Sequence, residues 1–470
     1  MTTVSLCMIV RDEEAFLPDC LASTRGVVQE VVVVDTGSHD ATKQIAASAG
    51  ARVFDFPWGD DFAAARNESL RHATGDWILV LDADERLAKE TSGRLLAAVN
   101  GRKFDCGLLR LHDAPTLDAR EHDVITGRTR CGDVQLLPRL LRRADDLSYV
   151  GAIHEDLMPW VLRGGRTLQS VDVDIVHFGS VQQVIVRKRK RERNLKLLRA
   201  ELVRRPGDVA AWGYLAHELL RIGANEDAQV AVNSGWAHVP PSAHGATVAI
   251  HRLATARAYL AILAGRFGEA RDTIRAARRF EPDNPDLTYL EAKAFEAEAQ
   301  RTTDRRAMVR LLRSARDGYR ACLRFGKTTF AQSFVEGAAS WTGFTRLGAV
   351  ELLLGRPAKA LLAFDAALCS RPDELEALLG RAEARIELGD PAGALRSMDG
   401  LLDDVSPDAW ALAALATQSL GMSSDARLFA RRAHTLSDRP FLAPHRMTRL
   451  RDILRRSPLT SAESRMTAGS

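Results

Sequence analysis

The first 180 residues alternate between short apolar runs and segments whose apolar positions recur at helical spacing. The four consecutive valines of the second run are typical of a parallel strand that is buried on both faces. A helix is expected after each of the first three runs, the third helix over residues 61–73. The pattern predicts a βαβαβαβ order, a parallel sheet with crossover helices. The runs are Val4–Val10, Val31–Val34, Arg52–Phe56 and Ile78–Leu81.

Polar side chains follow these strands at the point where each ends. Asp35 follows the second strand, with Ser38 expected to cap the helix that holds Ile45, and Asp82 and Asp84 follow the fourth. Ligands of open α/β sheets bind beyond the carboxyl ends of the strands, so these carboxylates are expected to face one ligand. Two hard oxygen donors suit Mg²⁺ or Mn²⁺. The alternative for Asp-x-Asp is a strand followed by an ordinary helix cap.

The same edge of the sheet offers groups for a nucleotide. Asp35 can accept a hydrogen bond from a uracil or a ribose, and Arg66, early on the third helix, can reach a base or a phosphate. No Gly-x-Gly-x-x-Gly sequence and no Walker sequence follows the first strand, which leaves a Rossmann dinucleotide site and a P-loop unsupported. A nucleotide is therefore expected to bind by another route.

The rest of the first 180 residues continues the strand pattern. Strands are expected over Cys106–Leu111 and Val171–Val176. Between them, the polar stretch over residues 112–133 is too long for a plain connection. It is expected to be either a lid or acceptor loop, or a mobile surface loop.

Four motifs in order resemble glycosyltransferase family 2: Ser5–Glu14, Val33–Ser38, Trp58–Asn67 and Leu81–Glu85. The resemblance implies a Rossmann-like GT-A fold, a nucleotide-sugar donor and inversion at the anomeric carbon. Where relatives usually carry Lys-Asn after the first strand, this chain has Arg-Asp. The resemblance implies nucleotide-sugar contacts at Val10, Arg11, Glu13, Asp35, Arg66 and Asp82.

The resemblance also implies a catalytic base and a complete metal site. Inverting transfer needs one carboxylate to deprotonate the acceptor, and a His-Glu pair after an Arg-Leu strand places that base at Glu155. Asp156 is the competing candidate, and His154 can orient the base or be structural. His177, after the last strand, would complete the metal site of Asp82 and Asp84, or be a buried structural histidine.

Beyond about residue 205 the strand signals stop and a period of about 34 residues begins, which is typical of tetratricopeptide repeats. Five clear units and one degenerate unit are expected, the latter over residues 285–328 with helices lengthened by about 11 residues. The basic run over residues 187–194 is expected to be a solvated helix face, or to carry cations toward a diphosphate. The best copy of the repeat has Phe344, Leu347, Gly348, Gly355, Ala360, Phe364, Ala367 and Pro372.

Composition narrows the class of protein. The chain has 470 residues, 46% of them hydrophobic and 27% charged, with a net charge of +4, so charge alone implies no nucleic-acid or membrane partner. Six scattered cysteines without Cys-x-x-Cys spacing predict reduced thiols in the cytoplasm and no zinc site. No run of about 18 apolar residues occurs, and the start of the chain leads directly into a strand, so neither a membrane span nor a signal peptide is expected.

Together these observations predict an α/β GT-A domain over residues 1–180, a basic linker helix over 181–205, an all-α repeat solenoid over 206–440, and a C-terminal helix with a disordered tail over 441–470. This order resembles bacterial family 2 transferases with tetratricopeptide repeats, which include enzymes that glycosylate ribosomal peptides on Ser or Cys. The leading hypothesis is a metal-dependent hexosyltransferase that uses a UDP-sugar and a peptide or protein acceptor recruited by the repeats. The alternatives are a transferase of lipopolysaccharide or cell-wall assembly, and a repeat scaffold with a decayed transferase domain. The sugar, the acceptor and the oligomeric state, a homodimer included, are left open.

Overall fold

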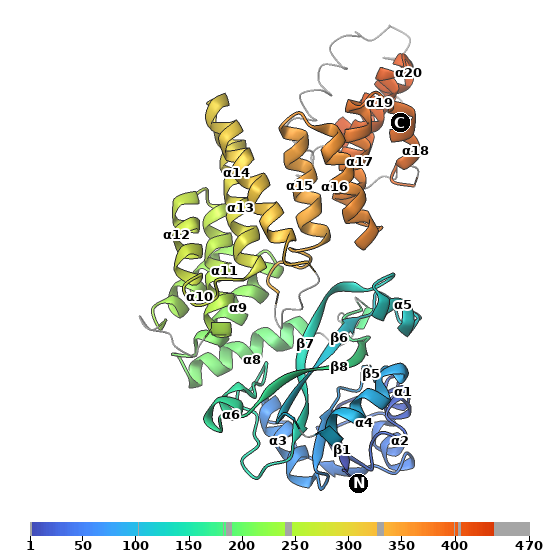
Figure 1. Cartoon of the computed structure of the whole chain (residues 1–470), viewed down its shortest axis with the longest axis vertical. Coiled ribbons are helices and arrows are strands. Elements are labelled where there is room, and N and C mark those ends of the chain that lie inside the picture. Colours follow the sequence, from blue (N-terminus) through green and yellow to red (C-terminus); the bar gives the residue numbers. More distant parts are fainter. Residues whose placement is uncertain are drawn as a thin grey trace. The chain divides into compact units, whose positions relative to one another are not determined.

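The computed structural model divides into two compact units (Figure 1). The first comprises Met1–Leu287 with Thr328–Glu336, and the second comprises Thr288–Lys327 with Gly337–Ser470. The expected C-terminal helix and tail, and part of the basic run, lie outside the described residues. The structure describes residues 2–101, 103–181, 183–184, 190–239, 247–326, 333–398, 400–402 and 406–436.

The first unit is built on a sheet whose strands follow the order β3-β2-β1-β4-β7-β6-β8-β5. The first four strands pair in parallel, which confirms the expected βαβαβαβ arrangement. The sheet as a whole is mixed, because β7 runs antiparallel to β4 and β6, and β5 runs antiparallel to β8. The strands are β1 Val4–Val10, β2 Glu30–Asp35, β3 Arg52–Asp55, β4 Trp77–Val80, β5 Glu85–Leu87, β6 Cys106–Asp113, β7 Cys131–Arg142 and β8 Leu168–His177.

Short helices connect these strands. The third begins at the cap Asp61, whose side chain accepts a hydrogen bond from the Ala64 amide at 2.9 Å. The expected cap at Ser38 is wrong, because its Oγ accepts a hydrogen bond from the Asp12 amide at 2.9 Å and so links the ends of β1 and β2. The expected loop over residues 112–133 contains a short helix, α5. These helices are α1 Leu17–Ser23, α2 Thr42–Ser48, α3 Phe62–His72, α4 Ser92–Gly101, α5 Glu121–Thr126 and α6 Met158–Arg163, with the 3₁₀ turn η1 Lys89–Thr91 before α4.

The sheet is buried on both faces. Alternate residues of β1 point to opposite sides, so Leu6 and Met8 pack with residues of α1, α2 and α4, whereas Cys7 packs with residues of α3 and α6. Figure 1 shows these helices beside the sheet. Trp77 and Trp160 are each 1% exposed and anchor the two layers. Because both faces are covered, the carboxyl-end edge is where polar groups meet solvent.

In the part of the first unit that the structure describes, helices α8 to α12 follow the sheet domain. Their core includes Ile153 from the turn after β7, together with Leu197, Leu198 and Leu215 of the helices. Trp58, next to β3, also packs against this cluster. The sheet domain and the first helices therefore share one hydrophobic core. The helices are α8 Lys190–Arg204, α9 Val209–Arg221, α10 Asn225–Trp236, α11 Thr247–Leu263 and α12 Phe267–Ala277.

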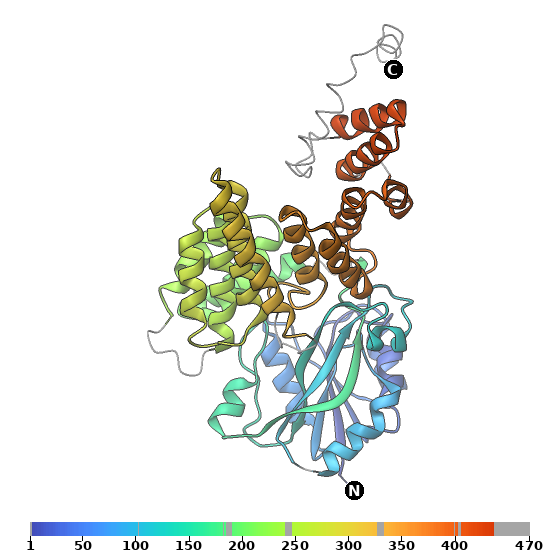
Figure 2. The ribbon, with the colours of Figure 1, turned by 45° about the horizontal axis from the view of Figure 1, so that its top comes forward.

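Six antiparallel helix pairs among the described residues, α9/α10 to α19/α20, match the predicted units (Figure 2). The long helices α13 and α14, of 17 and 19 residues, confirm the lengthened unit. In the second unit, Gly348 leaves room for Phe364, whose ring a Cβ at that position would meet at 2.7 Å. The helices that complete the array are α13 Pro285–Arg301, α14 Arg305–Leu323, α15 Trp341–Leu353, α16 Pro357–Ser370, α17 Leu375–Glu387, α18 Pro391–Ser397, α19 Pro407–Ser419 and α20 Ser423–Thr435.

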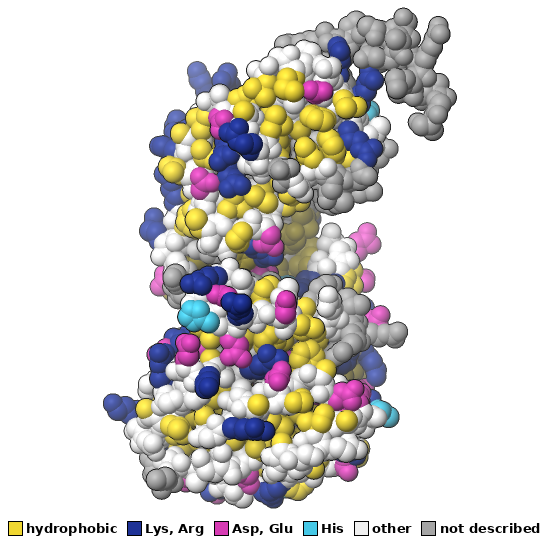
Figure 3. All heavy atoms as spheres, turned by 90° about the vertical axis from the view of Figure 1, so that its right-hand side faces the viewer, with side chains coloured by type: hydrophobic (Ala, Val, Ile, Leu, Met, Phe, Trp, Pro, Cys, Tyr) yellow, Lys and Arg dark blue, Asp and Glu magenta, His cyan; other side chains and the backbone are white. Residues whose placement is uncertain are grey.

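The surface carries charges of both signs. On the face drawn in Figure 3, basic, acidic and apolar side chains are interspersed. Within the described ranges, every helix is too short or too polar to cross a membrane.

Candidate active site

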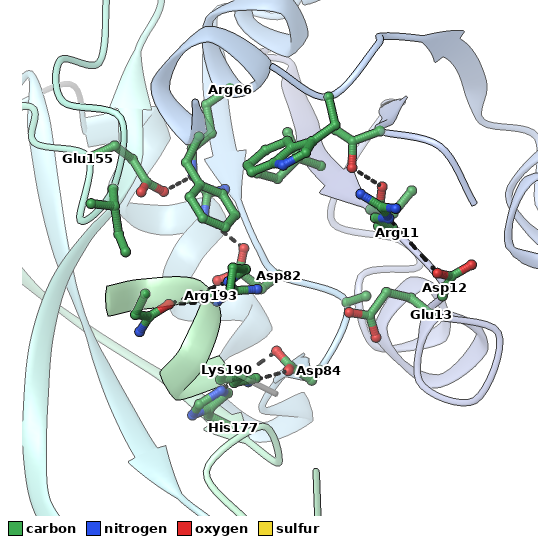
Figure 4. Close-up of a pocket in the computed structure, with 18 of the residues that line it drawn as sticks. Arg11, Asp12, Glu13, Arg66, Asp82, Asp84, Glu155, His177, Lys190 and Arg193 are labelled. Carbon is green, nitrogen blue, oxygen red and sulfur yellow. Dashed lines mark hydrogen bonds and ion pairs between the residues drawn. The ribbon is translucent and has the colours of Figure 1, made fainter. Parts of the chain in front are cut away.

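A cavity of about 810 Å³ opens at the carboxyl ends of β1 and β4 and is closed on one side by α8 (Figure 4). It is lined by all of the predicted site residues except Asp35 and Asp156. The residues brought together are Val10, Arg11, Glu13, Arg66, Asp82, Asp84, Glu155 and His177.

Asp35 lies buried at the end of β2, immediately before Thr36, which lines the cavity. Its Oδ2 accepts hydrogen bonds from the amides of Gly37 at 3.0 Å and Ser38 at 2.9 Å. Its Oδ1 is buried and has no hydrogen-bond partner among the described residues. A buried acceptor without a partner is unfavourable by about 1–3 kcal/mol, so this oxygen suits a ligand that donates a hydrogen bond.

Arg66 links two carboxylates of the cavity. From α3 its Nε donates to Glu155, and its Nη2 donates to Asp82 Oδ1 at 2.7 Å. Arg139 of β7 donates to the other oxygen of Asp82 at 3.1 Å. Burial raises the pKa of Asp82, but Arg66 and Arg139 outweigh burial and hold this pKa well below its usual range. The arginine expected at a base or phosphate therefore organises carboxylates of the protein itself.

Glu85 fixes the segment that carries the two aspartates. It is 2% exposed, accepts a hydrogen bond from the Asp82 amide at 3.0 Å and pairs with Arg139. Burial raises the pKa of Glu85 to about 7, against the lowering effect of Arg139. The backbone after β4 is thus held by a buried ion pair.

Asp84 and His177 face each other at the ends of β4 and β8. His177 Nε2 lies 3.6 Å from Asp84 Oδ1, while its Nδ1 is hydrogen-bonded to Asp113 Oδ1 at 2.6 Å. A Cβ at Gly179 would overlap the Asp84 carboxylate and lie 2.5 Å from His177 Nε2. Burial lowers the pKa of His177, but the hydrogen bond to Asp113 and the charge of Asp84 outweigh it and raise the pKa to about 9. The space in front of the pair exists only because residue 179 is glycine.

A divalent metal fits Asp84 and His177 better than it fits all three predicted ligands. Asp82 is occupied by two arginines, and among the described residues no three His, Cys, Asp or Glu side chains close around one point. A carboxylate and an imidazole whose other nitrogen is held by Asp113 form a common half-site for Mg²⁺ or Mn²⁺, which would have to displace the proton of His177 Nε2. Phosphate oxygens of a bound substrate and water molecules would complete the coordination of the metal.

The basic helix α8 also contributes to the cavity. Lys190 Nζ lies 3.4 Å from Asp84 Oδ2 and donates to the Gly179 carbonyl at 3.0 Å. Arg193 lines the same cavity, its guanidinium 5.1 Å from the centre of the Phe62 ring (Figure 4). Burial lowers the pKa of Arg193. These two residues of the basic run therefore line the cavity, and whether they approach a diphosphate stays a prediction.

The structure separates the two candidate bases. Glu155 lines the cavity, and its side chain is 14% exposed. Asp156 instead pairs through its backbone with Val150, and its side chain accepts a hydrogen bond from the Met158 amide at 2.8 Å at the start of α6. Burial raises the pKa of Asp156. Of these two carboxylates, only Glu155 lines the cavity.

The family model described as "Glycosyl transferase family 2" matches residues 5–149. The N-terminal domain is a family 2 glycosyltransferase domain. Its mixed sheet is GT-A-like, and helical repeats follow it. Glu155, His177 and α8 lie beyond the matched segment of the glycosyltransferase domain.

Two curated relatives each match part of the chain. A tetratricopeptide repeat-containing protein of Synechococcus elongatus is 44% identical over 157 residues, which cover 33% of this chain and 35% of that protein. The SPbeta prophage-derived glycosyltransferase SunS of Bacillus subtilis is 31% identical over 115 residues, 22% of this chain and 26% of SunS. The chain thus spans between a quarter and about a third of the length of these relatives.

Solved structures give weaker similarity. A tetratricopeptide repeat protein of Parabacteroides merdae aligns at 14% identity over 57% of this chain and 94% of that one, with a TM-score of 0.39. Glucosyl-3-phosphoglycerate synthase of Mycobacterium tuberculosis, in complex with Mn²⁺, UDP-glucose and phosphoglyceric acid, aligns at 24% identity over 23% and 44% of the two chains, with a TM-score of 0.21.

Sequence reasoning missed two residues that organise the glycosyltransferase site. Asp113 ends β6 and lies beside His177 in the β6/β8 register, so its place at a strand end was a usable signal. Arg139 belongs to the Arg-Leu strand, but its partners Asp82 and Glu85 are far away in sequence. Only the pairing of β7 with β4 brings them together.

Proposed function

We propose that this protein is an inverting, metal-dependent glycosyltransferase that moves a hexose from a UDP-sugar to a peptide or protein side chain. The observation that supports it is one cavity that combines a half-site for a divalent metal, Asp84 with His177, and a separate carboxylate, Glu155. A cavity of about 810 Å³ is large enough for a nucleotide sugar.

The donor would lie along the carboxyl ends of β2, β1 and β4. Asp35 Oδ1 is buried at the end of β2 next to Thr36, which lines the cavity, and would accept the N–H of a uracil ring that enters beside Thr36. A divalent metal held by Asp84 and His177 would neutralise the diphosphate and its developing charge. Lys190 and Arg193 would add positive charge beside it. Asp82, fixed by its two arginines, would then accept from a hydroxyl of the ribose or the sugar.

Glu155 would act as the general base. Its carboxylate takes the proton of an acceptor hydroxyl or thiol as the oxygen or sulfur bonds to the anomeric carbon. The bond between that carbon and the β-phosphate oxygen breaks, its electron pair leaves with UDP, and the configuration inverts. Arg66 keeps the base facing the reacting atoms.

The acceptor is proposed from the helical repeats. Stacked helix pairs present an extended surface that suits a peptide. Part of this chain is similar to the glycosyltransferase SunS, which supports the proposed transferase activity.

The test is metal-dependent hydrolysis of a panel of nucleotide sugars by the full chain, with water as acceptor. The wild type should hydrolyse a UDP-sugar only with Mg²⁺ or Mn²⁺. Glu155→Gln should bind the donor equally well and react about 10²- to 10⁴-fold more slowly. Asp156→Asn is the matched control and should stay near wild type, because its side chain does not line the cavity. Equal activity of Glu155→Gln and wild type would refute the assignment of the base.

A further inference from the structure

Glu155 is carried by a tight turn between Val150 and Asp156. The two residues exchange backbone hydrogen bonds of 3.0 and 2.9 Å, and the Ala152 carbonyl accepts from the Phe62 amide of α3 at 2.8 Å. Within this turn His154 has a φ of 53°, in the left-handed region that a residue with a Cβ seldom adopts. The direction of the Glu155 side chain depends on this backbone conformation.

His154 is held from outside the sheet domain. Its ring stacks on Tyr214 of α9, with ring centroids 3.8 Å apart and planes 13° from parallel. Its Nε2 is buried and has no hydrogen-bond partner among the described residues. Burial lowers the pKa of His154 to about 3, and the ring is neutral at physiological pH.

Tyr214 is itself fixed by helices of the first unit. The Arg252 guanidinium of α11 lies 4.4 Å from the centre of the Tyr214 ring and donates to His217 Nδ1 at 3.0 Å. Ile153, next to His154, is buried in the core that α8 and α9 share. Both residues that precede Glu155 are therefore anchored on the first helical repeat.

We propose that Tyr214 is a positioning residue for Glu155: its stack on His154 holds the left-handed turn and so keeps the carboxylate directed into the cavity. The inference rests on the proposed role of Glu155 as the base. It makes the first repeat part of the catalytic unit, in addition to any role of the array in binding an acceptor.

The physical reason is that a left-handed non-glycine residue persists only while its surroundings hold it. Without the Tyr214 ring, the turn can relax toward an ordinary φ, and the hydrogen bond from Arg66 would then be the contact that still holds the Glu155 carboxylate among the described residues. A displacement of about 1 Å between a catalytic group and the reacting atom can lower a rate by about 100-fold. Donor binding should be unaffected, because Tyr214 does not line the cavity.

Two variants separate the ring from the hydroxyl. Tyr214→Leu removes the aromatic face and keeps apolar bulk, whereas Tyr214→Phe keeps the stack. Tyr259→Leu is the matched control. Tyr259 is a half-buried tyrosine of α11 that takes no part in the His154 stack, and its ring centroid lies 6.1 Å from that of Phe334. All three are made in the full chain.

Three measurements are compared: the affinity for UDP with Mn²⁺, kcat for hydrolysis of the preferred UDP-sugar, and hydrogen exchange of the Val150 and Asp156 amides. For Tyr214→Leu we expect unchanged UDP affinity, a kcat about 10- to 100-fold lower, and exchange at least about 10-fold faster at both amides. Tyr214→Phe and Tyr259→Leu should match the wild type in all three.

Unchanged exchange in Tyr214→Leu, or faster exchange with an unchanged kcat, overturns the inference. A loss of UDP affinity that parallels the loss of kcat also overturns it, because the effect would then be general. If the wild type hydrolyses no donor, the proposed function fails. Exchange at Val150 and Asp156 still decides whether Tyr214 holds the turn.

Discussion

Replacing Arg66 by Met should destabilise the first unit strongly, because one guanidinium holds two carboxylates. The Arg66 side chain is 8% exposed, Glu155 is 14% exposed and Asp82 is 35% exposed. Asp82 keeps Arg139 as a partner. Loss of its ion pair with Arg66 should therefore lower the free energy of unfolding by only about 0–1 kcal/mol, as for a partly exposed pair. Glu155 would be left as a nearly buried charge, a change that typically costs about 3–5 kcal/mol.

A double-mutant cycle with Glu155→Gln isolates this pair. Glu155→Gln alone should cost about 1 kcal/mol, because it weakens one hydrogen bond while Arg66 keeps Asp82. The double variant carries no unpaired charge at position 155, so we expect a coupling energy of about 2–3 kcal/mol instead of additivity. The assay is urea unfolding of the full chain at pH 7, followed by a signal from the sheet domain.

Arg193→Met provides the control for the cycle. Arg193 lines the same cavity, but its guanidinium bonds to the neighbouring Asn194 at 3.1 Å and lies over the Phe62 ring. Arg193 acts on Glu155 through its charge without an ion pair to it, so its coupling to Glu155→Gln should be smaller than that of Arg66→Met. Additivity of Arg66→Met and Glu155→Gln would refute the reasoning, since the two side chains would then not share an ion pair in solution.

Asp84→Ala should abolish metal-dependent UDP binding, measured by calorimetry with and without Mn²⁺, because one of two protein ligands is lost. Gly179→Ala should weaken the same binding at least about 10-fold with both ligands present, since its Cβ would overlap Asp84 and crowd His177. His217 accepts from Arg252, so it is neutral in the folded chain, and burial lowers its pKa from 6.5 to about 3. Its contribution to stability is complete above pH 6.5 and falls by up to about 1.4 kcal/mol per pH unit toward pH 3. Urea unfolding at pH 7.5 and at pH 5 measures this effect. Between these two pH values, the free energy of unfolding of His217→Gln should fall by less than that of the wild type.

Each of these predictions has a contrary result. UDP binding by Asp84→Ala that still requires Mn²⁺ would place the metal elsewhere. Gly93→Ala in α4 is the control for Gly179→Ala, because a Cβ at position 93 meets nothing within 4 Å. Equal weakening of UDP binding by the two variants would refute the steric argument. An identical pH dependence of His217→Gln and wild type would show that His217 does not titrate on unfolding.

The sequence by itself determined the architecture. The apolar runs of β1 to β4 and the 34-residue period predicted a sheet followed by helix pairs, because burial patterns repeat within each element. It also identified the edge of the sheet that carries the polar groups, since Asp35, Asp82 and Asp84 follow apolar strands directly. The family resemblance brought in Glu155 and His177.

Tertiary structure alone decided how those groups are used. Nothing near Arg66 in sequence shows that it binds Asp82 and Glu155, which lie 16 and 89 residues away. The same holds for Asp113 with His177, at a separation of 64 residues, and for the stack of His154 on Tyr214. Patterns along a chain report which positions are buried. Which charges and rings meet depends on strand order and helix packing, and these follow from contacts between residues far apart in the sequence.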